Sequence, residues 1–278
     1  MTNRLLNDKE KSIFVWGACP AGSVHAGGAE TGSREYFEKV RNRRSGYEIV
    51  WLQELIPFCS FTNRTILELG CGAGYDAYEF CHHGAYYTGV DITPASLTLT
   101  KRHLMYYGYN PTLVRSDVEQ LPFRNGSFDV VYSNGVLHHT TDTSKSIAEA
   151  FRVLRMGGEL WVAVYHKNSL FYWITLFLVD HVLRLGFRRR SFEERLSMIE
   201  YTTSNELPLV KAFSRRHLRK MLSGTGFTVK SLWVRKLVVE DLPNIPLLGK
   251  IGRCIPPQWL DLLGKVLGWY IIARAEKQ

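Results

Sequence analysis

Three glycines at alternate positions, directly after an apolar run, constrain the fold of this chain more than any other feature. Residues 65–74 read TILELGCGAG, so a β-prone segment with one acidic residue, Glu68, breaks into Gly70, Gly72 and Gly74. Glycine leaves space beside the main chain, so such a loop can bring bare backbone against a ligand. In α/β folds that ligand lies at the carboxyl ends of the strands. The Glu68 carboxylate suits a cationic group better than a phosphate, which argues against a pyrophosphate-containing nucleotide.

The dinucleotide-binding fingerprint G-x-G-x-x-G is the first alternative. Gly70 and Gly72 fit its first two positions, but Tyr75 stands at the third. A second β-prone run, residues 86–92, contains Asp91, which follows Gly70 by 21 residues. An acidic residue at this distance in an α/β nucleotide fold accepts hydrogen bonds from ribose hydroxyls. We therefore predict a ribose contact for Asp91, the other interpretation being an ordinary loop aspartate.

Further along the chain, two segments again read as strands that end in polar residues. Residues 113–118 read LVRSDV and end on Asp117 and Val118, ahead of the run EQLPF. Residues 127–139 read SFDVVYSNGVLHH, an apolar strand that ends at Ser133-Asn134. Polar side chains at successive strand ends indicate a ligand site along one edge of a sheet.

A fifth segment, residues 148–165, reads as a helix, a diglycine turn and a strand from Glu159. In chain order the five segments resemble the core of class I S-adenosylmethionine-dependent methyltransferases, specifically the small-molecule type of ubiquinone and menaquinone biosynthesis. The resemblance covers about residues 60–165. It implies an α/β Rossmann-like sheet of seven strands, mostly parallel with an antiparallel last strand, matched here by residues 268–274. It also implies S-adenosylmethionine as the cofactor and S-adenosylhomocysteine as the product.

The resemblance assigns cofactor contacts residue by residue. The carboxylate of Asp117 would accept a hydrogen bond from the adenine amino group, and the next backbone N–H would meet a ring nitrogen. Cys71, inside the glycine loop, reads as a small filler rather than a nucleophile. The predicted cofactor residues are Glu68, Gly70, Cys71, Gly72, Gly74, Asp91, Ile92, Asp117, Val118, Ser133 and Asn134.

A general base is required only if the acceptor is protonated at neutral pH, as an alcohol or an ammonium is. His138, His139 and His166 are the candidate bases, because they follow predicted strand ends and histidine titrates in the useful range. Packing or loop hydrogen bonds are the alternative for His138 and His139. The acceptor atom stays open between oxygen, nitrogen, sulfur and carbon. The candidate acceptor contacts are Trp16, Tyr36, Tyr165 and Tyr172.

Segments outside the core give the expected domain organisation. Residues 1–62 read as an N-terminal helical lid, and residues 63–278 as the methyltransferase domain with cap insertions at about 166–213 and 236–267. The first insertion has an apolar stretch too short to span a bilayer. It either covers the acceptor or lies on a membrane surface, and we favour the cap.

The net charge of +9 is compatible with a nucleic-acid partner, with an anionic membrane surface as partner, or simply with a basic chain. Nucleic-acid modules usually add stacking aromatics or a recognisable accessory fold, and the sequence carries no such motif. We therefore expect a small-molecule acceptor, which the arginine clusters would suit if it carried an acidic group, and neither a nucleic-acid partner nor a membrane contact is favoured. Two alternatives stay open: a nucleic-acid or protein methyltransferase, and a non-catalytic S-adenosylmethionine-binding protein.

Cysteine usage and the ends of the chain complete these expectations. The five cysteines are scattered and lack C-x-x-C spacing, so neither a metal site nor a disulfide framework is predicted. The N-terminal residues lack the pattern of a secretory signal, and no run of apolar residues is long enough to span a membrane. A cytoplasmic location is the expectation.

Overall fold

One sheet organises the chain in the computed structural model, which describes residues 6–20, 22–200, 206–243, 245 and 255–278. Its seven strands follow the order β3-β2-β1-β4-β5-β7-β6. β7 runs antiparallel to both of its neighbours, and the other strands are parallel. This confirms the predicted sheet. The strands are β1 (Thr65–Leu69), β2 (Tyr86–Asp91), β3 (Thr112–Arg115), β4 (Phe128–Asn134), β5 (Leu154–Tyr165), β6 (Phe227–Arg235) and β7 (Tyr270–Lys277).

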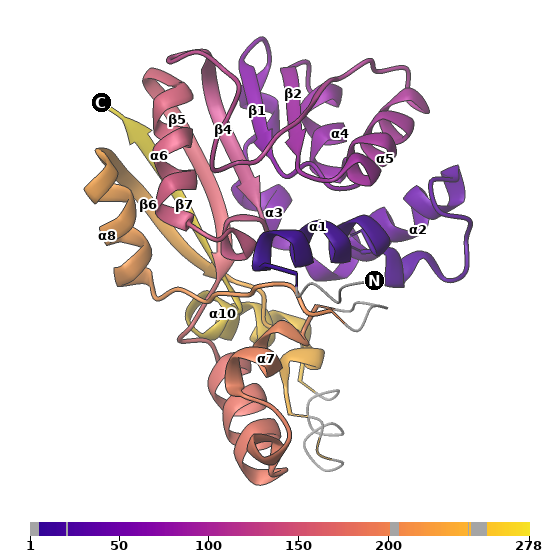
Figure 1. Cartoon of the computed structure of the whole chain (residues 1–278), viewed down its shortest axis with the longest axis vertical. Coiled ribbons are helices and arrows are strands. Elements are labelled where there is room, and N and C mark those ends of the chain that lie inside the picture. Colours follow the sequence, from indigo (N-terminus) through magenta and orange to yellow (C-terminus); the bar gives the residue numbers. More distant parts are fainter. Residues whose placement is uncertain (1–5, 21, 201–205, 244, 246–254) are drawn as a thin grey trace.

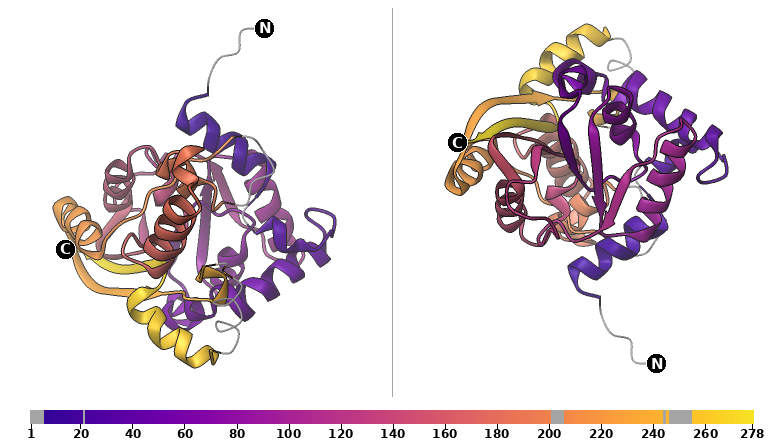
Figure 2. Two further views of the ribbon diagram at one scale, coloured as in Figure 1. Left: turned by 90° about the horizontal axis from the view of Figure 1, so that it is seen from below. Right: turned by 90° about the horizontal axis from the view of Figure 1, so that it is seen from above.

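Both faces of the central strands are buried, which explains their nearly continuous apolar sequences. In β1, Ile66 belongs to one core cluster and Leu67 to the other, and Val130 and Val131 alternate in the same way in β4. One cluster contains residues of α6 (Thr143–Val153) and α8 (Arg215–Thr225). The other contains residues of α3 (Val50–Leu55), α4 (Tyr75–His82) and α5 (Pro94–Met105). Helices therefore cover both faces of the sheet, as Figure 2 shows.

Side-chain caps fix where the core helices begin. Thr93 caps α5, Asp142 caps α6, and Ser214 caps α8, each accepting a hydrogen bond from a backbone N–H in the first turn. Gly226 ends α8 with a φ of 108°, a value that favours glycine. Caps of this kind satisfy backbone groups that the helix itself leaves unpaired.

Several helices make up the N-terminal segment. Ser33 caps α2 (Arg34–Arg43), and α1 runs from Asp8 to Ala18 and contains Trp16. Asn7 and Glu10 form a capping box that stabilises its start. Figure 1 shows α1 across the end of the sheet where β1, β2 and β4 finish. The N-terminal elements are α1 (Asp8–Ala18), η1 (Ser23–Ala26), α2 (Arg34–Arg43), η2 (Arg44–Glu48), α3 (Val50–Leu55) and η3 (Phe58–Phe61).

Two insertions interrupt the last strands. After β5 come η5 (Phe171–Leu183), η6 (Gly186–Arg188) and α7 (Phe192–Ser197), which project from the body at the lower end of Figure 1. After β6 come η7 (Val239–Asp241) and α10 (Pro257–Leu267). Parts of both predicted insertions lie outside the described residues. Within the described part of the chain, every helix is too short or too polar to cross a bilayer.

Candidate functional site: two adjoining cavities

Backbone hydrogen bonds to β2 hold the glycine loop that follows β1. The N–H groups of Gly70 and Cys71 both donate to the carbonyl of Val90, at 2.8 and 3.0 Å. Gly70 and Gly72 have φ values of 76° and 55°, a region that favours glycine. A side chain at Gly70 would clash with Val136, whereas one at Gly72 would meet no atom within 4 Å. The loop therefore needs glycine at the first position for packing and at the second leaves open space.

Asp91, at the end of β2, holds this loop in place. One carboxylate oxygen accepts from the backbone N–H of Gly72 at 3.1 Å. The other accepts from the backbone N–H and the hydroxyl of Thr93, both at 2.9 Å. Burial raises the pKa of Asp91, and the donors on Thr93 and Gly72 oppose that rise. The predicted ribose residue thus has a structural role as well.

A first cavity opens above the loop and the ends of β1, β2 and β4. Seven of the eleven predicted cofactor residues line it, although they come from four separate segments of the sequence. The structure therefore brings together most of the residues that the family resemblance assigned to the cofactor. The seven residues are Gly70, Gly72, Asp91, Ile92, Asp117, Val118 and Asn134.

The other four predicted cofactor residues lie outside the lining of this cavity. Glu68 is buried within β1, where its carboxylate accepts a hydrogen bond from the hydroxyl of Tyr87 at 2.5 Å. Burial raises the pKa of Glu68. Cys71 and Ser133 are also buried, and Gly74 caps α4. These residues support the loop from behind.

One wall of the first cavity comes from α1, which the sequence analysis missed. Lys9, Ser12 and Trp16 all face the cavity from this helix. The Lys9 ammonium lies 2.5 Å from a carboxylate oxygen of Asp117 and 3.2 Å from one of Glu119. The lysine therefore joins α1 to the core at the predicted adenine site. The capping box of Asn7 was the sequence signal that could have found this helix.

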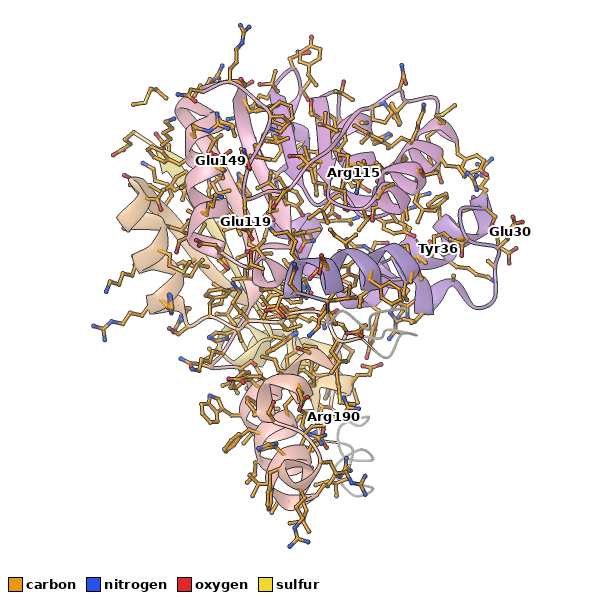
Figure 3. The ribbon with its side chains drawn as sticks, viewed as in Figure 1. Glu30, Tyr36, Arg115, Glu119, Glu149 and Arg190 are labelled. Atoms are coloured by element: carbon orange, nitrogen blue, oxygen red, sulfur yellow. The ribbon has the colours of Figure 1, made fainter. Side chains whose placement is uncertain are left out.

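Glu119 is a further lining residue that the sequence analysis did not assign. Its carboxylate accepts from the backbone N–H of Thr141 at 2.8 Å and from that of Asp142 at 3.0 Å. Although burial opposes the change, hydrogen bonds from the Thr141 hydroxyl and the Asp142 backbone N–H, together with Lys9, lower the pKa of Glu119 to about 2. Figure 3 labels Glu119 beside the start of α1. An ionised Glu119 holds the loop after β4 and helps to place Lys9.

A second cavity of about 290 Å³ adjoins the first. It lies between the N-terminal segment, the carboxyl end of β5 and the two insertions, and its lining includes Tyr165, Phe171, Glu200 and Trp269. Four residues line both cavities, and we call them the shared wall. The shared wall consists of Trp16, Asn134, Gly135 and His139.

His139 is the titratable residue of the shared wall. Its Nδ1 lies 2.7 Å from the carbonyl oxygen of Leu209. A carbonyl can only accept, so Nδ1 carries the proton and Nε2 keeps a lone pair. Nε2 lies 3.6 Å from Glu200, whose carboxylate also accepts from the Tyr165 hydroxyl at 2.7 Å. Burial lowers the pKa of His139, while Glu200 opposes that change.

The other two candidate bases line neither cavity. His138 is fully buried and stacks on Tyr165, with ring centroids 3.8 Å apart. Burial lowers its pKa well below the usual range. His166 is also buried, and its Nδ1 donates to the carbonyl of Gly268 at 2.9 Å. Of the three histidines, the structure places His139 alone in the lining of a cavity.

Two of the four predicted acceptor contacts line the second cavity, and the other two line neither cavity. Trp16 and Tyr165 line the second cavity. Tyr36 and Tyr172 are buried in apolar clusters of the lid and the first insertion and line neither cavity.

A buried polar network connects the lid to the shared wall. Asp76, in the first turn of α4, accepts from the guanidinium of Arg44, the hydroxyl of Tyr132 and the side-chain amide of Asn134, each at 3.0 Å. Although burial opposes it, Asp76 raises the pKa of Arg44. The amide of Asn134 is thereby held between the two cavities. Arg44 also lines the second cavity, with Arg43 beside it.

Comparison with known proteins agrees with this geometry. Residues 67–162 match the family model described as a methyltransferase domain. The ubiquinone biosynthesis O-methyltransferase of Dechloromonas aromatica is 28% identical over 141 residues, which are 49% of this chain and 58% of that protein. The phthiotriol/phenolphthiotriol dimycocerosates methyltransferase of Mycobacterium leprae is 39% identical over 103 residues, 36% of this chain and 37% of that protein. The matches thus span little more than half of the first relative and less of the second.

A solved structure has the same fold over more of the chain. The S-adenosylmethionine-dependent methyltransferase of Mesorhizobium loti aligns with a TM-score of 0.52 at 17% identity, covering 82% of this chain and 96% of that one. The sheet order, the glycine loop and the strand-end carboxylates define the chain as a class I methyltransferase fold. The family match covers residues 67–162 of this fold, so that part of the chain is similar in sequence to methyltransferase domains.

Proposed function

We propose that the chain transfers the methyl group of S-adenosylmethionine to a small-molecule acceptor bound in the second cavity. The observation that carries the proposal is the shared wall, because a methyl donor in one cavity and an acceptor in the other would meet there. Trp16, Asn134, Gly135 and His139 line both spaces. Alignment of donor and acceptor is the largest contribution that a protein can make to such a displacement.

The first cavity suits the cofactor on three counts. Gly72 offers open space beside its backbone, Asp91 presents a carboxylate at the ribose position, and Asp117 with Val118 stands where adenine is expected. When bound, the cofactor supplies a methyl group already activated by its sulfonium charge. The remaining tasks fall to the chain, which binds, orients and excludes water.

His139 is the residue we assign as general base. Its protonated Nδ1 is fixed on Leu209, and its lowered pKa favours a neutral ring with a free lone pair on Nε2 at pH 7. For a hydroxyl acceptor, the proton would pass to Nε2 while the new oxygen–carbon bond forms and the carbon–sulfur bond breaks. Glu200 then faces an imidazolium and stabilises it. The O-methyltransferase activity named for the Dechloromonas aromatica protein supports an oxygen acceptor.

The lining of the second cavity favours a partly aromatic acceptor. Tyr47, Phe171, Trp269 and Tyr270 contribute ring surface. Arg43 and Arg44 line the same cavity, and Glu240 and Asp76 already pair with them. An acidic group on the acceptor would have to share these guanidinium groups, so we propose an acidic group only as a secondary feature.

The test is methyl transfer from cofactor labelled in its methyl group to a metabolite extract. We expect label in the small-molecule fraction, and a loss of about 10²–10⁴-fold for His139→Ala. His166→Gln is the matched control, because it alters a buried histidine that lines neither cavity. Label in nucleic acid or protein would favour the alternative class of methyltransferase. Bound cofactor without transfer to any fraction would favour a non-catalytic binder.

A further inference from the structure

The first insertion has an unusual surface for a segment that was expected to cover the acceptor. We define the projecting hairpin as residues 170–199, which comprise η5, η6 and α7. Its inner side packs through Tyr172, Leu176 and Leu196 in a cluster that also contains Trp269. Figure 1 shows the rest of the hairpin extending away from the sheet. Only its base can therefore serve as a cap.

The outer side of the projecting hairpin is apolar. Seven large apolar side chains between residues 173 and 187 are 37% to 64% exposed. Several recur at intervals of about four residues along η5, which places them on one face of that helix. Soluble proteins rarely present so many apolar groups together without a partner. The exposed residues are Trp173, Ile174, Leu178, Val182, Leu183, Leu185 and Phe187.

Positive charge surrounds the tip of this apolar face. Residues 181–192 contain four arginines and no acidic residue. Arg188, Arg189 and Arg190 are exposed, and Figure 3 labels Arg190 on the hairpin. Arg184, also exposed, pairs with Asp180 at 2.8 Å. Apolar side chains and arginines on one projecting element match the two layers of a lipid surface that carries anionic headgroups.

We propose that the projecting hairpin docks the protein on an anionic lipid bilayer. η5 has 13 residues, which suits a helix lying in the interface rather than crossing it. The flanking arginines would contact lipid phosphates, while Trp173, Leu183 and Phe187 enter the upper acyl region. This reverses our sequence-based preference for the cap over most of the insertion.

A second copy of the chain is a weaker candidate for this surface. In a twofold symmetric contact the same patch faces itself, so two hairpins of the same net positive charge would be brought into one interface. Anionic headgroups supply the opposite charge instead. The proposal concerns a partner and does not require methyl transfer to be correct.

Docking would also place the second cavity near the lipid. Phe171, the first residue of η5, lines that cavity, as does Ile199 at the other end of the hairpin. A hairpin inserted in a bilayer would therefore lead from the lipid surface to the acceptor site. An amphiphilic acceptor could enter by this route, which is a consequence of docking that rests on the proposed function.

The experiment is flotation of the full-length protein with phosphatidylcholine vesicles, with and without phosphatidylglycerol. We expect binding to the anionic vesicles and its loss at high salt, because salt screens the arginine contacts. The double variant Leu183→Ser/Phe187→Ser should lose at least about tenfold in vesicle affinity, since it removes two apolar side chains from the inserted face. Replacing Arg188, Arg189 and Arg190 by Gln should remove the preference for anionic lipid.

Leu262→Ser/Leu263→Ser is the matched control, because it changes two exposed leucines on α10, outside the hairpin. It should leave vesicle binding unchanged. Thermal unfolding and S-adenosylhomocysteine binding report whether each variant is folded. The proposal is overturned if the hairpin and α10 variants lose binding equally, or if neutral vesicles bind as well as anionic ones. A dimer that the hairpin variants dissociate, without vesicle binding by the wild type, would assign the surface to a second copy.

Discussion

The ammonium group of Lys9 lies 2.5 Å from the carboxylate of Asp117, across 108 residues of sequence. Both groups are partly exposed, so the pair resembles a surface ion pair more than a buried one. Such pairs contribute roughly 0.2–1 kcal/mol. The same carboxylate is the proposed partner of the adenine amino group. Lys9 therefore holds the lid helix at a position that the cofactor would share.

Removing this ion pair should loosen α1 without unfolding the core. For Lys9→Met we expect hydrogen exchange of the α1 amides to rise by up to about fivefold, the equivalent of losing one exposed ion pair. Lys11→Met, on the same helix, is the control and should exchange like the wild type. Unchanged exchange in Lys9→Met would mean that packing of the helix, rather than Lys9, holds the lid.

Asp91 should be a major determinant of cofactor affinity. Asp91→Ala removes the proposed acceptor of the ribose hydroxyls, and we expect calorimetry to show a loss of about 1.5–3 kcal/mol, which is ten- to hundred-fold. The carboxylate also binds Gly72 and Thr93, so Asp91→Asn, which keeps one acceptor oxygen, should lose less. If Asp91→Ala stays folded and binds S-adenosylhomocysteine like the wild type, the ribose assignment is wrong.

The open space beside Gly72 should be filled by the cofactor. We expect Gly72→Val to abolish binding of S-adenosylmethionine, because the new side chain would occupy that space. Gly157→Val is a matched control, since Gly157 also has a positive φ, of 71°, and meets no atom within 4 Å. Both variants carry the backbone strain of a non-glycine residue at positive φ, roughly 1–2 kcal/mol. Equal loss of binding in the two variants would trace the effect to strain, and NAD binding by the wild type would contradict the site itself.

The contribution of His103 to stability should fall as the pH is lowered from 7 to 5. His103 is buried, stacks on Phe37 and donates to the carbonyl of Ala73. Burial lowers its pKa to about 4. The unfolded chain therefore takes up this proton near pH 6.5 while the folded chain does not, so the free energy of unfolding declines below that pH. One such histidine contributes a loss of about 2 kcal/mol at pH 5.

Denaturant titrations at several pH values test this prediction. His103→Gln should flatten the pH dependence, because glutamine can still donate to Ala73 but does not titrate. A variant with the same slope as the wild type would show that other groups dominate. His138 and His139 also have lowered pKa values, so some slope should persist in the variant.

The first cavity was largely predictable from sequence, whereas the second was not. Gly70, Asp91 and Asp117 each follow a recognisable strand, and parallel strands bring their carboxyl ends to one edge. Lys9 and Glu200 lie in separate segments that reach the site only through tertiary packing, so no local spacing marks them. Glu68 was predicted to contact the cofactor, and the structure adds a partner that its own strand does not indicate, because the hydroxyl of Tyr87 on the neighbouring strand donates to its carboxylate. A side-chain hydrogen bond between two neighbouring strands cannot be predicted from the sequence of either strand alone.

The histidines show the same limit. His138 and His139 are adjacent in sequence, and only the fold separates a buried ring stacked on Tyr165 from one that lines both cavities. The first insertion was correctly read as apolar and too short to span a bilayer. Its apolar residues are divided between an inner face and an exposed face, a distinction that the composition of the segment does not reveal.

Methyl transfer by Gly135→Val tests the shared wall most directly. Gly135 lines both cavities, has a φ of 78° and leaves open space at its Cβ position. Gly108 has the same φ and the same open space but lines neither cavity, so Gly108→Val matches the backbone strain. With labelled cofactor and the acceptor fraction, we predict that Gly135→Val loses transfer by about a hundredfold or more, because misalignment of this kind is costly, while Gly108→Val retains it. Transfer at the wild-type rate by a folded Gly135→Val protein would contradict the claim that donor and acceptor meet at the shared wall.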